Sequence, residues 1–215
     1  MSMKRPFVTP FGPDFVRAIR FGEPTPMARG GSMINVFDPE GRKLTFQTPK
    51  LRAPFGLDRT YEKPYLAMSC GDVPEFEKTL RDLEAAVIDA AISKYGEWFG
   101  RTEDPEIVRG LFVSTLRDDP MGRYPATWKV SIPMYGGRCQ TDVFDENHRE
   151  ASLDVIERGS NVIVLVEMAG LWFVDRKFGI RWKPVQILAT PRPAAPVAQA
   201  AAAAASTGVL FIDDE

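Results

Sequence analysis

Residues 160–174, with the sequence SNVIVLVEMAGLWFV, restrict the fold of this chain more than any other segment. The run is shorter than the roughly 18 apolar residues that a membrane helix needs. Its valines and isoleucines favour a strand over a soluble helix. An interior glycine often marks a bulge, so we predict one long β-strand that bends at Gly170.

A second apolar segment, FGIRWKPVQIL (178–188), follows after the short turn sequence DRK. Alternate residues of a strand point to opposite faces. Phe178, Ile180 and Trp182 then share one face, and Lys177, Arg181 and Lys183 share the other. The two segments therefore predict a hairpin with one apolar and one basic face.

Five further strand segments are expected elsewhere in the chain. MINVF and KLTFQ, separated by the turn sequence DPEGR, predict a hairpin near the N-terminus. KPYLAMSC (63–70) is expected as a strand. PATWKVSIPM (125–134) alternates buried and wet positions, with QTDVFDE (140–146) as its expected hairpin partner.

A helix is predicted over residues 74–96, because apolar residues recur there at helical spacing. Asp72 and Glu75 predict a capping box at its start. The opposite face is expected to be solvated, and a second short helix is expected within residues 103–116. The predicted buried positions are Phe76, Leu80, Leu83, Val87, Ala91 and Tyr95, and the predicted solvated acids are Glu77, Asp82, Glu84 and Asp89.

The chain of 215 residues, 44% of them hydrophobic, suits one main domain over residues 1–190 with an N-terminal extension. Its opening residues lack the apolar run of a signal peptide, so a cytoplasmic protein without membrane contact is expected. Cys70 and Cys139 are expected as buried thiols, since two cysteines and the single His148 cannot supply a zinc site. No cofactor or metal is predicted.

The charges are unevenly distributed along the chain. Residues 66–120 hold 6 basic and 12 acidic side chains, whereas residues 1–65 hold 11 and 6. With a net charge of -2, the chain is unsuited to coating duplex DNA by bulk charge. A local basic groove remains compatible with this balance.

Aromatic and basic side chains interleave in the predicted hairpin. Trp128 and Trp182 lie in phase with aliphatic neighbours and are expected in the core. Trp172 and Phe173 are adjacent, so they must point to opposite faces, and one of them is the candidate for stacking on bases. The candidate phosphate contacts are Arg176, Lys177, Arg181 and Lys183, with Lys129 on a neighbouring strand.

Residues 191–215 change to a Pro/Ala linker and then to the sequence GVLFIDDE. We expect a flexible, disordered tether that ends in a docking segment for partner proteins. A solubilising tail is the alternative, but it would not need apolar residues. The candidate docking residues are Leu210, Phe211, Asp213, Asp214 and Glu215.

The order of these elements resembles the single-stranded DNA-binding proteins of podophages and of large nucleocytoplasmic DNA viruses. The resemblance covers about residues 60–190 and is strongest between 159 and 188. It implies an OB fold, a five-stranded partly open β-barrel with an inserted helix. It also implies a non-enzymatic protein that coats single strands in DNA replication, recombination or repair. The matching positions are Gly159, Ser160, Trp172, Gly179, Ile180, Trp182, Lys183 and Gln186.

Two other functional classes stay open at this point. Asp142, Asp145 and Glu146 could hold the metal of a nuclease, although acids around a turn are usually solvated. A virion, scaffold or adaptor protein that binds only protein is the second. A homodimer is also left open, and the Arg-rich segment Arg17–Arg59 is the alternative DNA site. The tail departs from that of the phage proteins, because Phe211 precedes the acids and Glu215 is last.

Overall fold

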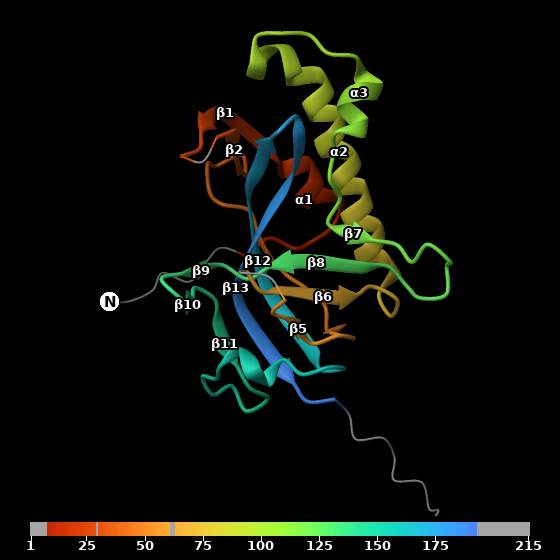
Figure 1. Ribbon diagram of the computed structural model, residues 1–215, viewed down its shortest axis with the longest axis vertical. Helices are drawn as coiled ribbons and strands as arrows, with labels where there is room; N and C mark the ends of the chain where they lie inside the picture. The colour runs from red at the N-terminus through yellow and green to blue at the C-terminus, as the bar shows by residue number, and fades with distance from the viewer. Residues whose placement is uncertain (1–7, 29, 61–62, 193–215) are drawn as a thin grey trace, which may run out of the picture.

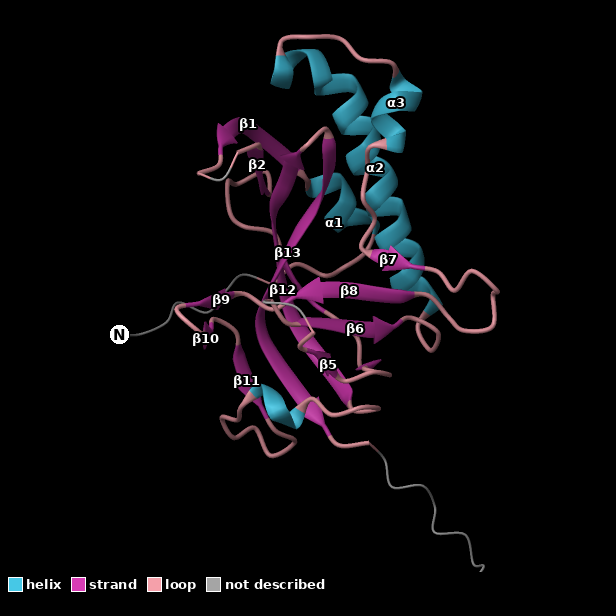
Figure 2. Ribbon diagram, in the orientation of Figure 1, coloured by secondary structure: helices cyan, strands magenta, loops and turns pink. Residues whose placement is uncertain are grey.

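The computed structural model describes residues 8–28, 30–60 and 63–192. The predicted tether and its docking residues Leu210, Phe211, Asp213, Asp214 and Glu215 lie outside the described residues. The helices are α1 (Pro13–Ala18), α2 (Pro74–Phe99), α3 (Pro105–Gly110) and the short 3-10 helix Leu153–Val155. The fold is mainly β, as predicted, and α1, α2 and α3 gather at one side of the strands (Figure 2).

The strands follow in chain order. They are β1 (Arg20–Pro26), β2 (Ser32–Phe37), β3 (Thr45–Gln47), β4 (Leu51–Arg52), β5 (Leu57–Asp58), β6 (Tyr65–Ser69), β7 (Leu116–Arg117), β8 (Thr127–Ser131), β9 (Met134–Tyr135), β10 (Arg138–Cys139), β11 (Asp142–Phe144), β12 (Asn161–Val174) and β13 (Lys177–Thr190).

The predicted hairpin is confirmed as β12 and β13, the two longest strands (Figure 1). Asp175 and Arg176 join them, both with positive φ, which is the backbone of a tight hairpin turn. The register shifts between Met168 and Gly170, which confirms the bend. A Cβ on Gly170 would lie 2.3 Å from the Ile34 carbonyl oxygen, so only glycine lets β2 approach here.

The strands form a closed circuit. β12 pairs with β4, β4 with β6, β6 with β8, and β8 with β7. The segment before β7 then pairs with β13 through a parallel bridge between Phe112 and Phe178, and β13 returns to β12. We count residues 45–52 as the first strand, and β7 with the segment before it as the link between β8 and β13. The order around the circuit is then residues 45–52, β6, β8, β13 and β12. This order is the five-stranded barrel of an OB fold, as predicted.

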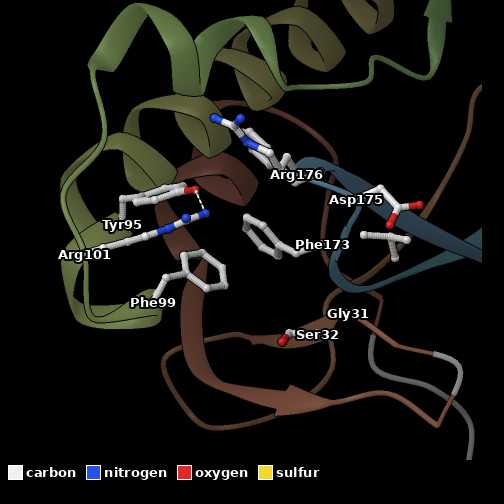
Figure 3. Close-up of a pocket in the computed structure, with 10 residues that line it drawn as sticks. Gly31, Ser32, Tyr95, Phe99, Arg101, Phe173, Asp175 and Arg176 are labelled. Carbon is white, nitrogen blue, oxygen red and sulfur yellow. Dashed lines mark hydrogen bonds between the residues drawn. The ribbon is translucent and has the colours of Figure 1, made fainter.

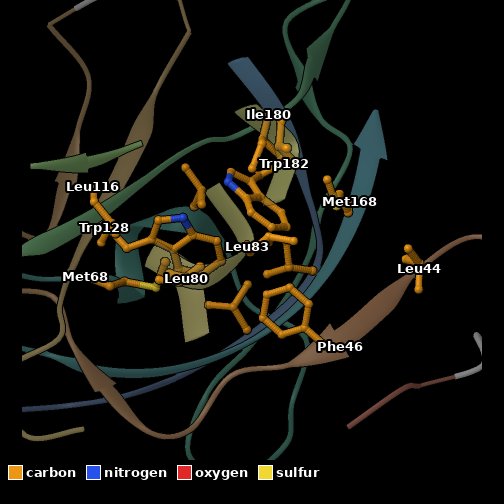
Figure 4. Packing of buried hydrophobic residues seen from close by; sticks show 14 of the residues in the cluster. Leu44, Phe46, Met68, Leu80, Leu83, Leu116, Trp128, Met168, Ile180 and Trp182 are labelled. Carbon is orange, nitrogen blue, oxygen red and sulfur yellow. The ribbon is translucent and has the colours of Figure 1, made fainter. Parts of the chain in front are cut away.

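The barrel interior is filled by large aromatic and aliphatic side chains (Figure 4). Trp128 is fully buried, and Trp182 packs edge-on against it with ring centroids 5.2 Å apart. Phe46 contacts both rings, and Leu80 and Leu83 of α2 belong to the same buried cluster. The prediction that both tryptophans are core residues is confirmed.

Helix α2 covers one side of the barrel (Figure 1). All six predicted apolar positions are buried, which confirms the periodicity. The predicted capping box is wrong, because Val73 is the N-cap and no side chain caps it. The Phe76 and Glu77 N–H groups donate to the Val73 carbonyl oxygen, so the first turn closes on the backbone alone. Glu84 is also not simply solvated, since it accepts hydrogen bonds from Ser114 Oγ and Thr115 N.

Two predicted hairpins are wrong. The segments MINVF and KLTFQ do not pair with each other, because the long edge of β12 accepts both β2 and β3, while β2 forms its hairpin with β1. The turn chemistry still holds, since Asp38 Oδ1 accepts from the Glu40 and Arg42 N–H groups. Segment 140–146 contains β11, which runs parallel to β13 and does not pair with β8.

The second predicted helix is shorter than expected. α3 ends at Gly110, and the residues after it pair with β13 and β8 as part of the barrel wall. Within the described residues, no helix is long and apolar enough to cross a membrane.

Candidate nucleic-acid interface

A groove with a volume of about 700 Å³ crosses the outer face of β8 and β13. We call it the β8–β13 groove. Its walls also include Lys63 before β6, Met134 and Tyr135 of β9, and Trp172 of β12. The groove therefore gathers side chains from four segments that are far apart in the sequence.

Four cations line the β8–β13 groove, namely Lys63, Lys129, Arg181 and Lys183, and its described lining contains no carboxylate. Among the described residues, no carboxylate oxygen lies within 4.0 Å of the charged nitrogens of these four side chains. Elsewhere the basic side chains commonly pair with acids, as Arg81 does with Glu77 and Asp118. The groove thus concentrates positive charge that forms no direct ion pair among the described residues.

Lys129 is held at the groove wall by an aromatic ring. Its Nζ lies 3.2 Å from the centroid of the Tyr65 ring, which is a close cation–π contact. The Tyr65 hydroxyl donates to Asp58 Oδ2. Hydrogen bonds from Thr60 and Tyr65 lower the pKa of Asp58 to about 2, with a smaller contribution from the charge of Lys129. The Tyr65 ring thus holds the charged end of Lys129 at the groove wall.

Trp172 is the half-buried aromatic ring of the groove wall. It pairs across the hairpin with Gly179, and a Cβ on that glycine would lie 3.0 Å from Trp172 Cζ2. The indole therefore rests on a backbone position that has no side chain. Tyr135, whose exposed fraction is 80%, presents a second ring at the same groove.

Phe173 points to the opposite face of the hairpin (Figure 3). Its ring stacks on Phe178, with centroids 5.1 Å apart, and packs against Phe99 and Trp98 of α2. It lines a smaller pocket of about 180 Å³, which we call the α2 pocket, together with Tyr95, Phe99, Arg101 and Arg176. Of the two predicted stacking candidates, only Trp172 lies with the groove cations.

The other predicted phosphate contacts divide in the same way. Lys129, Arg181 and Lys183 line the β8–β13 groove. Arg176 lies at the α2 pocket, and its Nη2 is 3.4 Å from Glu103 Oε2. Lys177 is exposed at the start of β13 and lines neither cavity. The structure thus brings Lys129, Trp172, Arg181 and Lys183 together and places Phe173, Arg176 and Lys177 elsewhere.

The groove floor is tied to helix α2. Trp182 Nε1–H donates to Thr115 Oγ1 over 3.1 Å, and Thr115 N–H donates to Glu84 Oε1 over 3.0 Å. Thr115 itself lines the groove. This chain of bonds fixes the segment between α3 and β8 against the barrel.

Sequence reasoning missed Lys63, Thr115, Tyr135 and Gln140 as groove residues. Lys63 and Thr115 lie in connecting segments, and only the closed circuit of strands brings them to β13. A signal was available for Tyr135, because its exposed ring directly precedes the turn glycines Gly136 and Gly137.

Of the acidic residues considered for a metal, Asp145 serves the local backbone. Asp145 Oδ1 accepts from the N–H groups of Asn147 and Arg149, and these bonds lower the pKa of Asp145. Among the described residues, no three His, Cys, Asp or Glu side chains are grouped to hold a metal ion.

The thiols of Cys70 and Cys139 differ in burial. Cys70 is fully buried as predicted, and burial raises the pKa of its thiol to about 11. Cys139 is only half-buried, contrary to expectation, because it sits in the short β9–β10 hairpin beside the barrel.

Comparison with solved structures gives distant likenesses only. The single-stranded DNA-binding protein gp2.5 encoded by bacteriophage T7 is 11% identical, covers 79% of this chain and 100% of its own, and has a TM-score of 0.45. The C-terminally truncated single-stranded DNA-binding protein from bacteriophage Enc34 is 12% identical, with coverages of 84% and 98% and a TM-score of 0.44. The Enc34 protein in complex with single-stranded DNA is 11% identical, covers 81% of this chain and 97% of its own, and has a TM-score of 0.42. At such TM-scores, these likenesses define neither the fold nor the ligand of this chain.

None of the curated proteins matches the sequence. A family model does match, over residues 70–200, and it describes a family of unknown function, DUF5871. The matched range includes α2, β8 and the whole β12–β13 hairpin, and so most of the groove. The chain therefore belongs to the family of unknown function DUF5871.

Proposed function

We propose that this protein binds single-stranded DNA without sequence preference in the β8–β13 groove. In this proposal it coats exposed strands during replication or recombination and has no chemistry of its own. The observation that carries it is the meeting of four cations with the rings of Trp172 and Tyr135 in a groove whose described lining has no acid.

The chemistry of the groove matches what a single strand offers. Every base has a flat face that can stack on an aromatic ring, and every phosphate carries a charge that a lysine or arginine can meet. Stacking does not depend on base identity, so such a groove accepts strands of any sequence. Duplex DNA keeps its bases stacked on one another, so they cannot stack on Trp172.

The test is a titration of fluorescent oligo(dT) over a range of salt concentrations, with a duplex of equal length as competitor. The proposal expects binding of the single strand, weakening with salt, and no shortening of the strand when Mg²⁺ is added. A variant with Lys129→Ala, Arg181→Ala and Lys183→Ala should lose most of this binding. A charge-matched control with Arg117→Ala, Arg158→Ala and Arg192→Ala removes three exposed cations that lie outside the groove.

Equal losses in the two triple variants would show that binding depends on total charge and not on the groove. Absence of any binding by the wild-type chain would contradict the proposal and favour a scaffold protein. Metal-dependent cleavage would instead favour a nuclease.

The tail segment GVLFIDDE is proposed as the docking element for replication or recombination proteins. Its acids and apolar residues suit a basic, partly apolar surface on a partner. Deletion of residues 207–215 should abolish capture of such partners. It should also tighten DNA binding modestly at low salt, since exposed ion pairs between acids and the groove are worth at most about 1 kcal/mol each.

A further inference from the structure

Glu167 is a buried carboxylate on the β12 strand. Its neighbours Val166 and Met168 are fully buried in the core, so Glu167 points to the outer side of the barrel wall. The Glu167 side chain is only 10% exposed, and its Oε1 lies 2.6 Å from Nζ of Lys43, whose side chain is 64% exposed. Because a buried charge without a partner is costly, Lys43 satisfies a carboxylate that would otherwise seek another cation.

The sheet register identifies that other cation. Glu167 and Lys183 are direct cross-strand partners in the β12–β13 pairing. Such partners point to the same side of a sheet, with Cβ atoms about 4.5–5.5 Å apart. Lys183 lines the β8–β13 groove, yet among the described residues no carboxylate oxygen lies within 4.0 Å of its ammonium.

We infer that Lys43 is a positioning residue for DNA binding, which holds Glu167 away from Lys183 and so leaves Lys183 free for phosphate. This inference rests on the proposed function. Lys43 is not part of the described groove lining, so it acts through Glu167 and not through contact with the strand. Without Lys43, the buried carboxylate recruits Lys183, which cancels one groove cation.

The experiment compares oligo(dT) affinity in wild type, Lys43→Ala, Glu167→Gln, the double variant and Lys183→Ala. Lys43→Ala should weaken binding by the same factor as Lys183→Ala, about fivefold at 0.1 M salt, because one phosphate contact accounts for about 0.7 in the log-log salt slope. Glu167→Gln alone should bind at least as tightly as wild type. The double variant should regain wild-type affinity, since no carboxylate is left to recruit Lys183. Arg117→Ala, an exposed arginine outside both the groove and the segment Arg17–Arg59, is the control.

A double variant as weak as Lys43→Ala would overturn the inference, because Lys43 would then contact DNA directly. Unchanged affinity in Lys43→Ala would overturn it as well.

A second readout needs no DNA. NMR of 13C-methylated lysines reports the surroundings of the Lys183 amine, so its methyl signal should move in Lys43→Ala and return in the double variant. If wild type fails to bind oligo(dT) but this signal moves, the proposed function is wrong and the pairing is right. If wild type binds and neither this signal nor the affinity responds to Lys43→Ala, only the inference is wrong.

Discussion

The two faces of the β12–β13 hairpin carry similar residues in opposite settings. On one face, Trp172, Arg181 and Lys183 line an open groove whose described cations have no acidic partner. On the other, Phe173 packs among the rings of α2 and Arg176 pairs with Glu103. Rings and cations therefore indicate a binding surface only where packing and ion pairing leave them available.

The largest effect should come from the packed face. Phe178 is 1% exposed and contacts the rings of Phe173 and Phe112. Phe178→Ala should lower the free energy of unfolding by about 3–5 kcal/mol, because it leaves a cavity in the core. Urea denaturation measures this loss, and Lys177→Ala, its exposed neighbour, should change stability by less than about 0.5 kcal/mol. A stable Phe178→Ala variant would show that this face is not a true core.

Gly179 couples the two faces. A Cβ there would lie 2.8 Å from the Val113 carbonyl oxygen and 3.0 Å from the Trp172 ring. Gly179→Ala should cost about 1–3 kcal/mol of stability through overpacking, and it should also weaken oligo(dT) binding by shifting Trp172. Gly110→Ala, where a Cβ would meet nothing within 4 Å, is the control. Intact affinity in a destabilised Gly179→Ala variant would argue against Trp172 as a stacking residue.

Substitutions of Trp172 and Phe173 test most directly whether the two faces of the hairpin differ in function. Trp172→Ala should cost about 1–3 kcal/mol of oligo(dT) binding with little change in unfolding, because one stacking platform is lost. Tyr124→Ala removes a ring that is 70% exposed outside the groove and should leave affinity unchanged. Phe173→Ala should show the reverse pattern, with lost stability and retained affinity. Equal loss of affinity in the Trp172 and Phe173 variants, both folded, would remove the distinction between the faces.

Lys183 should contribute to affinity for every sequence alike. Lys183→Ala should flatten the log-log salt slope by about 0.7, because one phosphate contact is lost. Titrations with oligo(dT) and with a mixed-sequence strand at several salt concentrations measure the salt slope and show whether the loss of affinity is the same for both strands. A slope equal to that of an Arg117→Ala control, an exposed residue outside the groove, would place the strand elsewhere, with the segment Arg17–Arg59 as the next candidate.

Arg176 at the hairpin tip should have the smallest effect. Its ion pair with Glu103 is largely exposed on the arginine side, so Arg176→Ala should change stability by less than about 1 kcal/mol. Since Arg176 lies outside the groove, oligo(dT) affinity should stay close to that of wild type. A loss as large as that of Lys183→Ala would show that the strand continues over the tip towards the α2 pocket.

Local patterns in the sequence were sufficient to predict the elements whose partners are adjacent in the chain. The β12–β13 hairpin, its bend at Gly170 and the buried stripe of α2 depend on residues within a few positions of one another. The basic and apolar faces of β13 follow from strand alternation alone. Among the strands, the pairings predicted for MINVF, KLTFQ and QTDVFDE were wrong, because sequence alternation shows that a strand has a buried face but not which strand lies beside it.

By itself, the sequence determined a mainly β chain with an aromatic and basic hairpin, and it offered Trp172 and Phe173 as stacking candidates. Only the tertiary structure separated these two rings, because α2 packs on the face that carries Phe173, whereas Trp172 lines the groove on the other face. Closure of the barrel brought Lys63, Thr115 and Tyr135 to the same groove. The sheet register placed Glu167 opposite Lys183, and Lys43 forms the ion pair with Glu167. These are contacts between distant segments, and they depend on which surfaces bury one another, which no local pattern of residues encodes.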